Sequence, residues 1–285
     1  MKVLVTGVKG QLGFDICKEF DARGIDNIGV GRNDFDITDQ NAVFAYMKMS
    51  QPDAVIHCSA WTAVDAAEDH PETAASVNVE GTRNIALACK EIGAKMMYIS
   101  TDYVFPGTGD HFYEVNDMPG PASVYGRTKL EGERAVKEIL DEYFIVRISW
   151  VFGINGKNFV RTMLNLAKTR DELGVVSDQI GSPTYTADLA RLLCDMAATE
   201  KYGTYHATNE GVCSWAEFAE EIFRLAGETV KVNYIRTKDY PAKACRPLNS
   251  RLSKKTLDDA GFSRLPHWKD ALARYIEELK GERIN

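Results

Sequence analysis

The stretch KVLVTGVKGQLGFDICKEF (residues 2–20) joins a short apolar run, a glycine-rich turn and an amphipathic helical pattern. The apolar run has no polar alternation, which is typical of a strand buried on both faces of a sheet. Leu12, Ile16 and Phe20 recur at the spacing of one helical face. The stretch therefore predicts a buried strand at 2–7, a tight turn and a helix at 10–24.

Three glycines in this turn, Gly7, Gly10 and Gly13, have the spacing GxxGxxG. Gly7 permits a tight turn, Gly10 lets a phosphate approach the backbone, and Gly13 lets the helix pack closely on the strand. The start of the helix supplies free N–H groups and a positive dipole end for a pyrophosphate. Because the triplet lies between a strand and a helix, it indicates a dinucleotide-binding turn, and glycines that only tighten the turn are the minor alternative.

The alternation of strand and helix continues through the first 150 residues. Further strands are predicted at 27–31, 54–60, 95–101 and 143–149, and helices at 41–50, 71–92 and 122–140. Strands separated by helices form βαβ units and a parallel sheet. We therefore predict an α/β fold with a doubly wound parallel sheet (Rossmann) in which the first strand is central.

The pattern becomes less regular after SWVFG (149–153). Helices are predicted at 157–169, 214–227 and about 267–280, strands at 203–209 and 230–235, and a strand, a turn and a helix within 174–198. Ser214 and Glu217 have the spacing of a capping box. We predict a smaller α/β substrate-binding lobe at about 154–185 and 213–285. The NAD(P)-binding Rossmann domain then comprises 1–153 plus about 186–212.

Composition excludes several classes of protein. The net charge of −7 gives no basic footprint for nucleic acid, and no apolar run approaches the roughly 18 residues of a membrane span. Six scattered cysteines without a CxxC pair suggest neither a disulfide framework nor a zinc site. The start MKVLVTG has no signal-peptide pattern. We expect a reduced cytoplasmic protein without a metal site, in which Asp65, Glu68 and Asp69 form a solvated helix start.

The end of the second predicted strand bears on the choice of cofactor. NAD-binding chains have an acidic residue there, roughly 20 residues after the glycines, for the ribose 2′-OH. This chain has Gly31 and Arg32 instead, so we expect NADPH to be preferred, with NADH as the alternative. A solvated loop arginine is the other interpretation of Arg32. Asp36 and Ile37 follow where a loop could cover the adenine.

The sequence YGRTK (125–129) places Tyr125 and Lys129 one helical turn apart on the same face. This helix is predicted to begin near the carboxyl ends of the strands, where ligands bind in such sheets. A tyrosine there can donate a proton to a carbonyl oxygen, and a nearby ammonium favours the phenolate. Thr101 or Ser100 can hold the substrate oxygen. The set predicts reversible carbonyl reduction beside a nicotinamide.

These motifs resemble those of the extended short-chain dehydrogenase/reductases. More narrowly, GQLG, TAVDAAE, STDYVFPGTG, VYGRTKLEGE, SWVFG, GKNFVRTM, DQIGSPT and RPLNSRL resemble, in order, the dTDP-4-dehydrorhamnose reductase family. The resemblance implies NAD(P)H-dependent reduction of the C4 ketone of dTDP-4-dehydro-β-L-rhamnose to dTDP-L-rhamnose, a step of nucleotide-sugar and polysaccharide biosynthesis. The partner implied is therefore a small dTDP-sugar.

The resemblance also implies roles for single residues. Tyr125 would be the proton donor, Lys129 its partner toward the cofactor ribose, and Thr101 the hydroxyl contact of the substrate. Cofactor contacts are implied or expected at Gly7, Gly10, Gln11, Leu12, Gly13, Arg32, Asp36, Ile37, Ala60, Trp61 and Thr62, and substrate contacts at Val64, Asp102, Trp150, Asn158 and Arg246. Trp61 stands where the family often has His or Tyr. A planar guanidinium such as that of Arg246 suits a diphosphate.

Other functions stay open at this point. One is a reductase or an epimerase of another NDP-4-keto sugar, and net oxidation of NADPH separates the two. Another is a non-catalytic regulatory subunit of methionine adenosyltransferase, a role of close relatives of this fold. The sequence defines neither the exact sugar nor the nucleotide base, and it leaves open a homodimer with a metal shared between chains.

Overall fold

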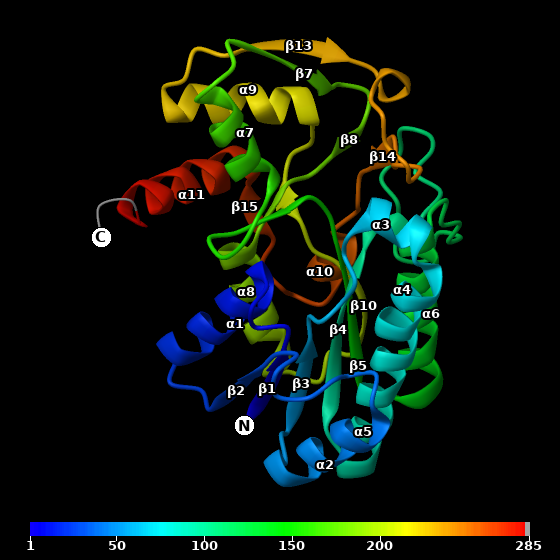
Figure 1. Cartoon of the computed structure of the whole chain (residues 1–285). Helices are drawn as coiled ribbons and strands as arrows, with labels where there is room; N and C mark the ends of the chain where they lie inside the picture. Colours follow the sequence, from blue (N-terminus) through cyan, green and yellow to red (C-terminus); the bar gives the residue numbers. More distant parts are fainter. Residues whose placement is uncertain (283–285) are drawn as a thin grey trace.

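A six-stranded parallel sheet forms the larger part of the computed structural model, which describes residues 1–282 (Figure 1). Its order is β10-β5-β4-β3-β1-β2, and every neighbouring pair is parallel. The strands are β1 (Val3–Thr6), β2 (Asn27–Val30), β3 (Ala54–His57), β4 (Lys95–Thr101), β5 (Tyr143–Ile148) and β10 (Gly203–His206). The predicted α/β fold with a doubly wound sheet is confirmed.

The position of β1 differs from the prediction. It lies between β3 and the edge strand β2, so it is interior but not central. After β2 the chain crosses back over β1, and β3, β4, β5 and β10 are added in succession on the other side. The strand order therefore reverses between β1 and β3, and open α/β sheets bind ligands at the carboxyl ends of the strands at such a point.

Helices cover both faces of this sheet (Figure 1). One face is covered by α1 (Gln11–Ala22) and α8 (Thr186–Ala197), and the other by α2 (Gln40–Ser50), α5 (Thr82–Ile92) and α6 (Val124–Ile139). Val3 and Val5 belong to the core beneath α1 and α8, whereas Leu4 belongs to the opposite core. This alternation explains why the strand has no polar face.

The long helix predicted at 71–92 is divided into three segments. They are α4 (Pro71–Ala75), a π-helical turn (Ser76–Gly81) and α5, and a short helix α3 (Val64–Asp69) precedes them. Within the π-helical turn, buried Asn78 accepts a hydrogen bond from Trp61 N at 2.8 Å and donates to Thr128 Oγ1 at 2.9 Å. The local widening thus lets one side chain join the loop after β3 to helix α6.

The smaller lobe lies above the carboxyl ends of the strands in Figure 1. Its elements are β6 (Val151–Phe152), α7 (Phe159–Ala167), β7 (Glu172–Val176), β8 (Ile180–Gly181), β9 (Thr184–Tyr185), β12 (Cys213–Ser214), α9 (Trp215–Ala226), β13 (Lys231–Ile235), β14 (Asn249–Ser250) and α11 (Trp268–Glu282). The short pair β11 (Asn209–Glu210) and β15 (Leu265–His267) lies between the lobes, and α10 (Lys255–Asp259) packs on the large sheet beside β10. The capping box of α9 is confirmed, because Ser214 and Glu217 exchange both bonds. The exact domain boundaries stay a prediction.

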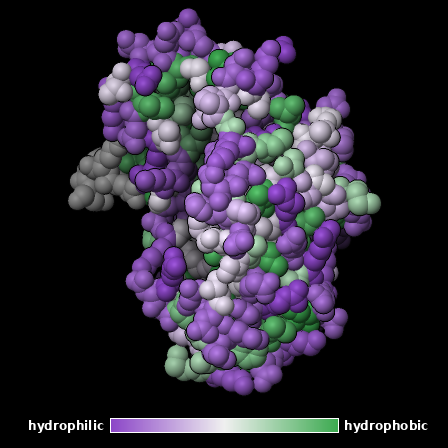
Figure 2. Space-filling view, turned by 45° about the vertical axis from the view of Figure 1, so that its right-hand side comes forward, coloured by the Kyte–Doolittle hydropathy of each residue, from purple (hydrophilic) through white to green (hydrophobic). Residues whose placement is uncertain are grey.

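A furrow separates the smaller lobe from the body of the molecule, and hydrophilic side chains predominate on the face that Figure 2 shows. Across the part of the chain that the structure describes, no helix has both the length and the apolar character to cross a membrane. All six cysteines are free thiols.

A buried ion pair fastens α6 to the sheet. Glu133 on α6 accepts hydrogen bonds from Arg147 Nε at 2.9 Å and Arg147 Nη2 at 2.7 Å. Only 1% of the Glu133 side chain and 2% of the Arg147 side chain are exposed. Ser100 Oγ donates to the same carboxylate at 2.5 Å, and Arg147 Nη1 donates to Val115 O. The pair is bidentate and fully hydrogen-bonded, which a buried pair needs in order to offset its desolvation.

We expect Arg147→Met to lower the free energy of unfolding by about 3–5 kcal/mol, because it leaves the buried Glu133 carboxylate without its hydrogen-bonded counter-charge. Urea titration followed by circular dichroism measures the change. Lys255→Met is the control, since Lys255 forms an exposed ion pair with Asp259 and should leave the midpoint nearly unchanged. Equal midpoints for the two variants would show that the buried pair does not stabilise α6.

Candidate active site

The glycine turn lies at the carboxyl end of β1, beside the end of β3. Gly7 has φ of +72°, and Gly10 N donates to Gly7 O at 2.9 Å. A Cβ on Gly13 would lie 2.5 Å from Gly7 O, so only glycine fits there. Gly10 is the N-cap of α1 and provides no side-chain cap, and the first amides of a helix have no partner within it. The turn thus forms a backbone cradle suited to a pyrophosphate.

Gln11 and Leu12 follow directly in α1. Leu12 is buried in the core, so its amide rather than its side chain is the group that can face a ligand. Gln11 Oε1 accepts hydrogen bonds from Gly153 N at 2.8 Å and Asn158 Nδ2 at 3.0 Å. The Gln11 side chain therefore joins α1 to the loop that enters the smaller lobe.

Asn158 belongs to this joint. Its Nδ2 also donates to Gly153 O and to Tyr275 Oη, both at 2.9 Å, while its Oδ1 caps α7 by accepting from Arg161 N. Both ends of the amide are therefore engaged within the protein. The N-cap position and the lobe joint both use this side chain, and the substrate contact of Asn158 stays a prediction.

Two basic residues, Arg32 and Lys9, lie near the end of β2. Arg32 is exposed, and the side-chain carbons of Lys9 lie 3.8–3.9 Å from the position of a Cβ on Gly31. Asp36 accepts hydrogen bonds from Thr38 N and Thr38 Oγ1, which lower its pKa, with a smaller contribution from Arg32. Ile37 packs against Gly81, where a Cβ would lie 2.7 Å from Ile37 Cδ1. Sequence reasoning missed Lys9, although its place inside the glycine turn was a signal.

The loop after β3 carries three of the expected cofactor residues. Trp61 is held through its backbone by Asn78, and its indole Nε1 donates to Ala63 O at 3.2 Å. Trp61 packs in one apolar cluster with Tyr125. Ala60 is half-buried and Thr62 is exposed, and half-buried Val64 begins α3. Trp61 is therefore next to the tyrosine that the sequence singled out.

Tyr125 lies in the first turn of α6, which Ser123 caps by accepting from Gly126 N at 3.1 Å. The phenol is hydrogen-bonded to Thr101, the last residue of β4. Its ring meets Tyr103 edge to face, with centroids 5.4 Å apart. The structure thus brings together Thr101 and Tyr125, as the sequence predicts.

Lys129 is buried one turn further along α6. Its Nζ donates to Ile99 O at 2.8 Å and lies 4.0 Å from the centre of the Tyr98 ring. Burial lowers the pKa of Lys129 to about 7, although Glu133 and Cys58 act to raise it. The ammonium is therefore directed at the backbone of β4 and poised to titrate near neutral pH.

The pKa of Tyr125 moves in the direction opposite to the expected one. Burial raises it, the Thr101 hydrogen bond lowers it less, and Asp102 and Tyr103 act to raise it. The expected lowering by Lys129 does not prevail, because the half-buried phenol loses hydration and the ammonium is directed at Ile99 O. A raised pKa keeps the phenol protonated, which is the form that donates a proton.

Asp102, which the resemblance implies as a sugar contact, follows Thr101 at the end of β4. It is buried, its Oδ1 accepts from Thr101 Oγ1 at 2.9 Å, and its Oδ2 accepts from Ser250 Oγ. Burial raises the pKa of Asp102 to about 6, while the two hydroxyl bonds lower it. Each carboxylate oxygen accepts one hydroxyl bond within the protein and has a further lone pair, so the sugar contact of Asp102 stays a prediction.

Trp150 and Arg246 approach the site from the side of the smaller lobe. Trp150 has φ of +50° and stacks on Trp215 with centroids 3.7 Å apart. A non-glycine residue in this region is strained by about 1–2 kcal/mol, and such strain is concentrated at functional sites. Arg246 Nη1 bonds Tyr103 Oη at 3.3 Å and Nη2 bonds Asp65 Oδ2 at 2.6 Å. Asp65 lies half-exposed in the first turn of α3, as expected, and is in addition the partner of Arg246.

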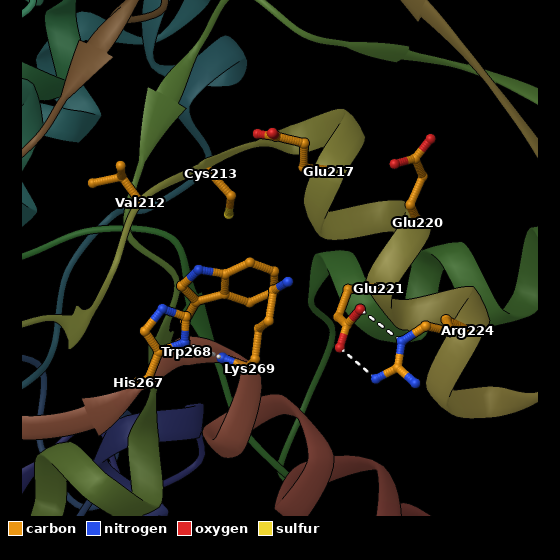
Figure 3. Close-up of a pocket in the computed structure, with 9 residues that line it drawn as sticks. All are labelled: Val212, Cys213, Glu217, Glu220, Glu221, Arg224, His267, Trp268 and Lys269. Carbon is orange, nitrogen blue, oxygen red and sulfur yellow. Dashed lines mark hydrogen bonds and ion pairs between the residues drawn. The ribbon is translucent and has the colours of Figure 1, made fainter.

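A separate pocket lies in the smaller lobe between α9 and the start of α11 (Figure 3). It contains none of the predicted site residues, and its charged side chains already have partners. Glu217 caps α9, Glu220 accepts from Tyr234 Oη at 2.8 Å, and Glu221 pairs with Arg224. Within residues 1–282, no three His, Cys, Asp or Glu side chains are grouped to hold a metal ion.

Comparison with known proteins agrees with this geometry. The family model described as the RmlD substrate binding domain matches residues 1–280. The chain belongs to the RmlD family. A dTDP-4-dehydrorhamnose reductase of Streptomyces griseus is 43% identical over 285 residues, which cover 98% of this chain and 94% of that protein.

Two solved structures extend the likeness to three dimensions. A dTDP-4-dehydrorhamnose reductase of Clostridium acetobutylicum is 44% identical with a TM-score of 0.96, covering 98% of this chain and 100% of that one. The enzyme of the same name from Bacillus anthracis, in complex with NADP, is 42% identical with a TM-score of 0.95, covering 97% of this chain and 99% of that one. The RmlD fold is thus conserved along nearly the whole chain.

The environment of Lys129 makes its titration measurable. With carbon-13 at lysine Cε, we expect one resonance to titrate near pH 7 and to be missing from Lys129→Met. Since the folded pKa is below that of the unfolded chain, this group makes stability rise with pH between about 7 and 10.5. Exposed Lys255, whose pKa Asp259 raises, is the internal control. Ordinary alkaline titration of every lysine would contradict the burial argument.

Proposed function

We propose that this chain is an NAD(P)H-dependent dTDP-4-dehydrorhamnose reductase, which reduces the C4 ketone of dTDP-4-dehydro-β-L-rhamnose to dTDP-L-rhamnose. The observation that carries the proposal is the hydrogen-bonded pair of Tyr125 and Thr101 at the end of β4. This pair lies in a chain of the RmlD family that is 43% identical to a protein of that name. The reaction belongs to nucleotide-sugar and polysaccharide biosynthesis, and the cytoplasm is the compartment that we propose.

The residues present fit a nicotinamide dinucleotide. Gly7, Gly10 and Gly13 form the cradle that a Cβ would fill, and the free amides of Gln11 and Leu12 supply donors for the pyrophosphate. Further contacts are proposed along the same edge of the sheet, from Asp36, Ile37, Ala60, Trp61 and Thr62. When bound, NADPH supplies the hydride for the sugar C4.

Tyr125 supplies the proton for the C4 oxygen. Its raised pKa keeps the hydroxyl protonated at neutral pH until charge develops on the substrate oxygen. As the C=O double bond opens, the oxygen takes the phenolic proton and Tyr125 is left as a phenolate. Lys129, with a pKa of about 7, is the nearby group that can release a proton for its recovery.

Substrate contacts are proposed at the boundary of the two lobes. Arg246 offers a planar guanidinium for the diphosphate. The guanidinium is hydrogen-bonded to Tyr103, and the ring of Tyr103 contacts the ring of Tyr125. Val64 and Trp150 are retained as contacts of the sugar. Asp102 and Asn158 are also retained as proposed contacts, Asn158 from the joint between the lobes.

Purified protein, dTDP-4-dehydrorhamnose and NADPH test this proposal through the loss of nicotinamide absorbance and identification of the sugar product. We expect Tyr125→Phe to lower kcat by about 100-fold or more, because the general acid is lost, while NADP still binds. Tyr202→Phe is the matched control, since its hydroxyl bonds Glu142 far from the Tyr125 cluster.

Three outcomes would count against the proposal. Near-normal kcat in Tyr125→Phe would exclude this residue as the donor. Conversion of the sugar without net NADPH oxidation would indicate an epimerase. No turnover, together with tight binding to a methionine adenosyltransferase, would indicate a regulatory subunit.

Cofactor preference is a separate prediction. Arg32 and Lys9 place two positive charges at the end of β2, which suits the 2′-phosphate of NADPH. Replacing both with alanine should lower kcat/KM for NADPH about tenfold or more and leave the value for NADH nearly unchanged. Lys18→Ala, at a distant exposed pair with Glu278, is the control. A strong preference of the wild-type protein for NADH would contradict the argument.

A further inference from the structure

The chain between β13 and β14 starts and ends in the smaller lobe and reaches the larger lobe in between. At its start, Thr237 N and Thr237 Oγ1 donate to Asp178 Oδ1 at 2.8 and 2.7 Å. At its end, Leu248 O accepts from Ile180 N at 2.9 Å. The residues between these two anchors, 240–247, cross to helix α3, and we call them the strap.

One carboxylate of α3 binds the strap at two points. Asp65 Oδ1 accepts from Ala244 N at 3.0 Å, and Asp65 Oδ2 accepts from Arg246 Nη2 at 2.6 Å. Arg246 Nη1 donates to Tyr103 Oη at 3.3 Å. These bonds use two of the five N–H groups that a guanidinium carries, so donors remain for an anion. The side chain of Arg246 is 26% exposed, and a ligand can therefore reach it.

Helix α3 also holds the start of α6. Glu68, one turn after Asp65, accepts at 2.8 Å from the backbone N of the residue before Tyr125. The same short helix thus holds the guanidinium of Arg246 and the helix turn that bears Tyr125. Tyr103 lies between them, because its Oη binds Arg246 and its ring meets the ring of Tyr125 with centroids 5.4 Å apart.

This spacing suits a sugar nucleotide. In the proposed substrate the ketone is at C4 and the diphosphate is on C1, so the two groups lie on opposite sides of the sugar ring. In the protein, one aromatic ring separates Arg246 from Tyr125. An arginine side chain loses rotamer freedom when it binds a phosphate, and a side chain that is already held loses less.

We propose that Asp65 is a positioning residue, which holds the Arg246 guanidinium in the orientation that binds the diphosphate of the dTDP-sugar. The inference rests on the proposed reductase function, in which Arg246 contacts the diphosphate. Asp65 acts through Arg246 and does not itself touch the ligand. The bond from Ala244 N fixes the carboxylate, so that its other oxygen is directed at the guanidinium.

Asp65→Asn tests the proposal with dTDP as the ligand, and isothermal titration calorimetry measures the Kd. The new amide oxygen can still accept from Ala244 N, whereas the new NH2 group cannot accept from Arg246. We expect dTDP to bind about tenfold more weakly, because the freed arginine must then be immobilised on binding. Removal of a negative charge alone would strengthen the binding of an anion, so the direction of the change separates positioning from repulsion.

A double-mutant cycle tests whether the effect passes through the guanidinium. Arg246→Ala should weaken dTDP binding about tenfold or more, and adding Asp65→Asn should cause no further loss. In turnover, Asp65→Asn should raise KM for the dTDP-sugar about tenfold and leave kcat nearly unchanged, because the diphosphate is bound equally before and during reduction at C4. A residue needed only for the fold would show neither this split nor this coupling.

Asp69→Asn is the matched control. Asp69 lies on the same helix and pairs with Lys243 of the same strap, and both side chains are about half exposed. An exposed pair contributes little, so both the Kd of dTDP and KM should stay within about twofold of the wild-type values. Asp65 is itself 45% exposed, and its variant should fold as the wild-type protein does.

Unchanged or tighter dTDP binding in Asp65→Asn would overturn the proposal, as would a further loss in the double variant. If the protein binds dTDP with the expected coupling and does not reduce the ketone, the proposed function fails and the role of Asp65 stands. If it reduces the ketone and Asp65→Asn leaves KM unchanged, the role of Asp65 fails and the function stands. A wild-type protein that does not bind dTDP would contradict both.

Discussion

The bidentate ion pair of Glu133 and Arg147 determines where the catalytic helix sits. Tyr125, Lys129 and Glu133 follow one another at four-residue intervals along α6, so fixing one of them fixes the face that carries the others. Ser100 bonds the same carboxylate, and Thr101 follows it at the end of β4. Because the pair is shielded from water, separating its charges is strongly unfavourable. One buried contact therefore sets the relative positions of the helix and strand that supply the site.

The part of the fold that sequence could predict is the part governed by local pattern. The strand, glycine turn and helix at 2–24 follow from apolar spacing and from glycine positions, and the structure reproduces them. The place of β1 in the sheet depends on the side to which later strands are added, which no local pattern encodes. The break of the helix at 71–92 likewise depends on Asn78, whose partners Trp61 and Thr128 are distant in sequence.

In the candidate site, too, the sequence predicted what local pattern determines and not what distant residues determine. The residue types and spacing of Thr101, Tyr125 and Lys129 indicated carbonyl chemistry, and the structure gathers them along β4 and α6. The surroundings of Asp102 and Asn158 could not be predicted, because their partners Ser250 and Tyr275 lie more than 100 positions away in the chain. The directions of the pKa shifts could not be predicted from the sequence either, because they follow from burial in the folded protein.

The stack of Trp150 on Trp215 joins the segment between β5 and β6 to the first residue of α9, within the hydrophobic cluster of the smaller lobe. Two indole rings whose centroids are 3.7 Å apart and whose planes differ by 13° couple their excited states. Near-ultraviolet circular dichroism and tryptophan emission should therefore change whenever these rings separate. The protein thus carries a built-in optical reporter of the packing of α9 against the chain that enters the smaller lobe, and no attached dye is needed to follow it.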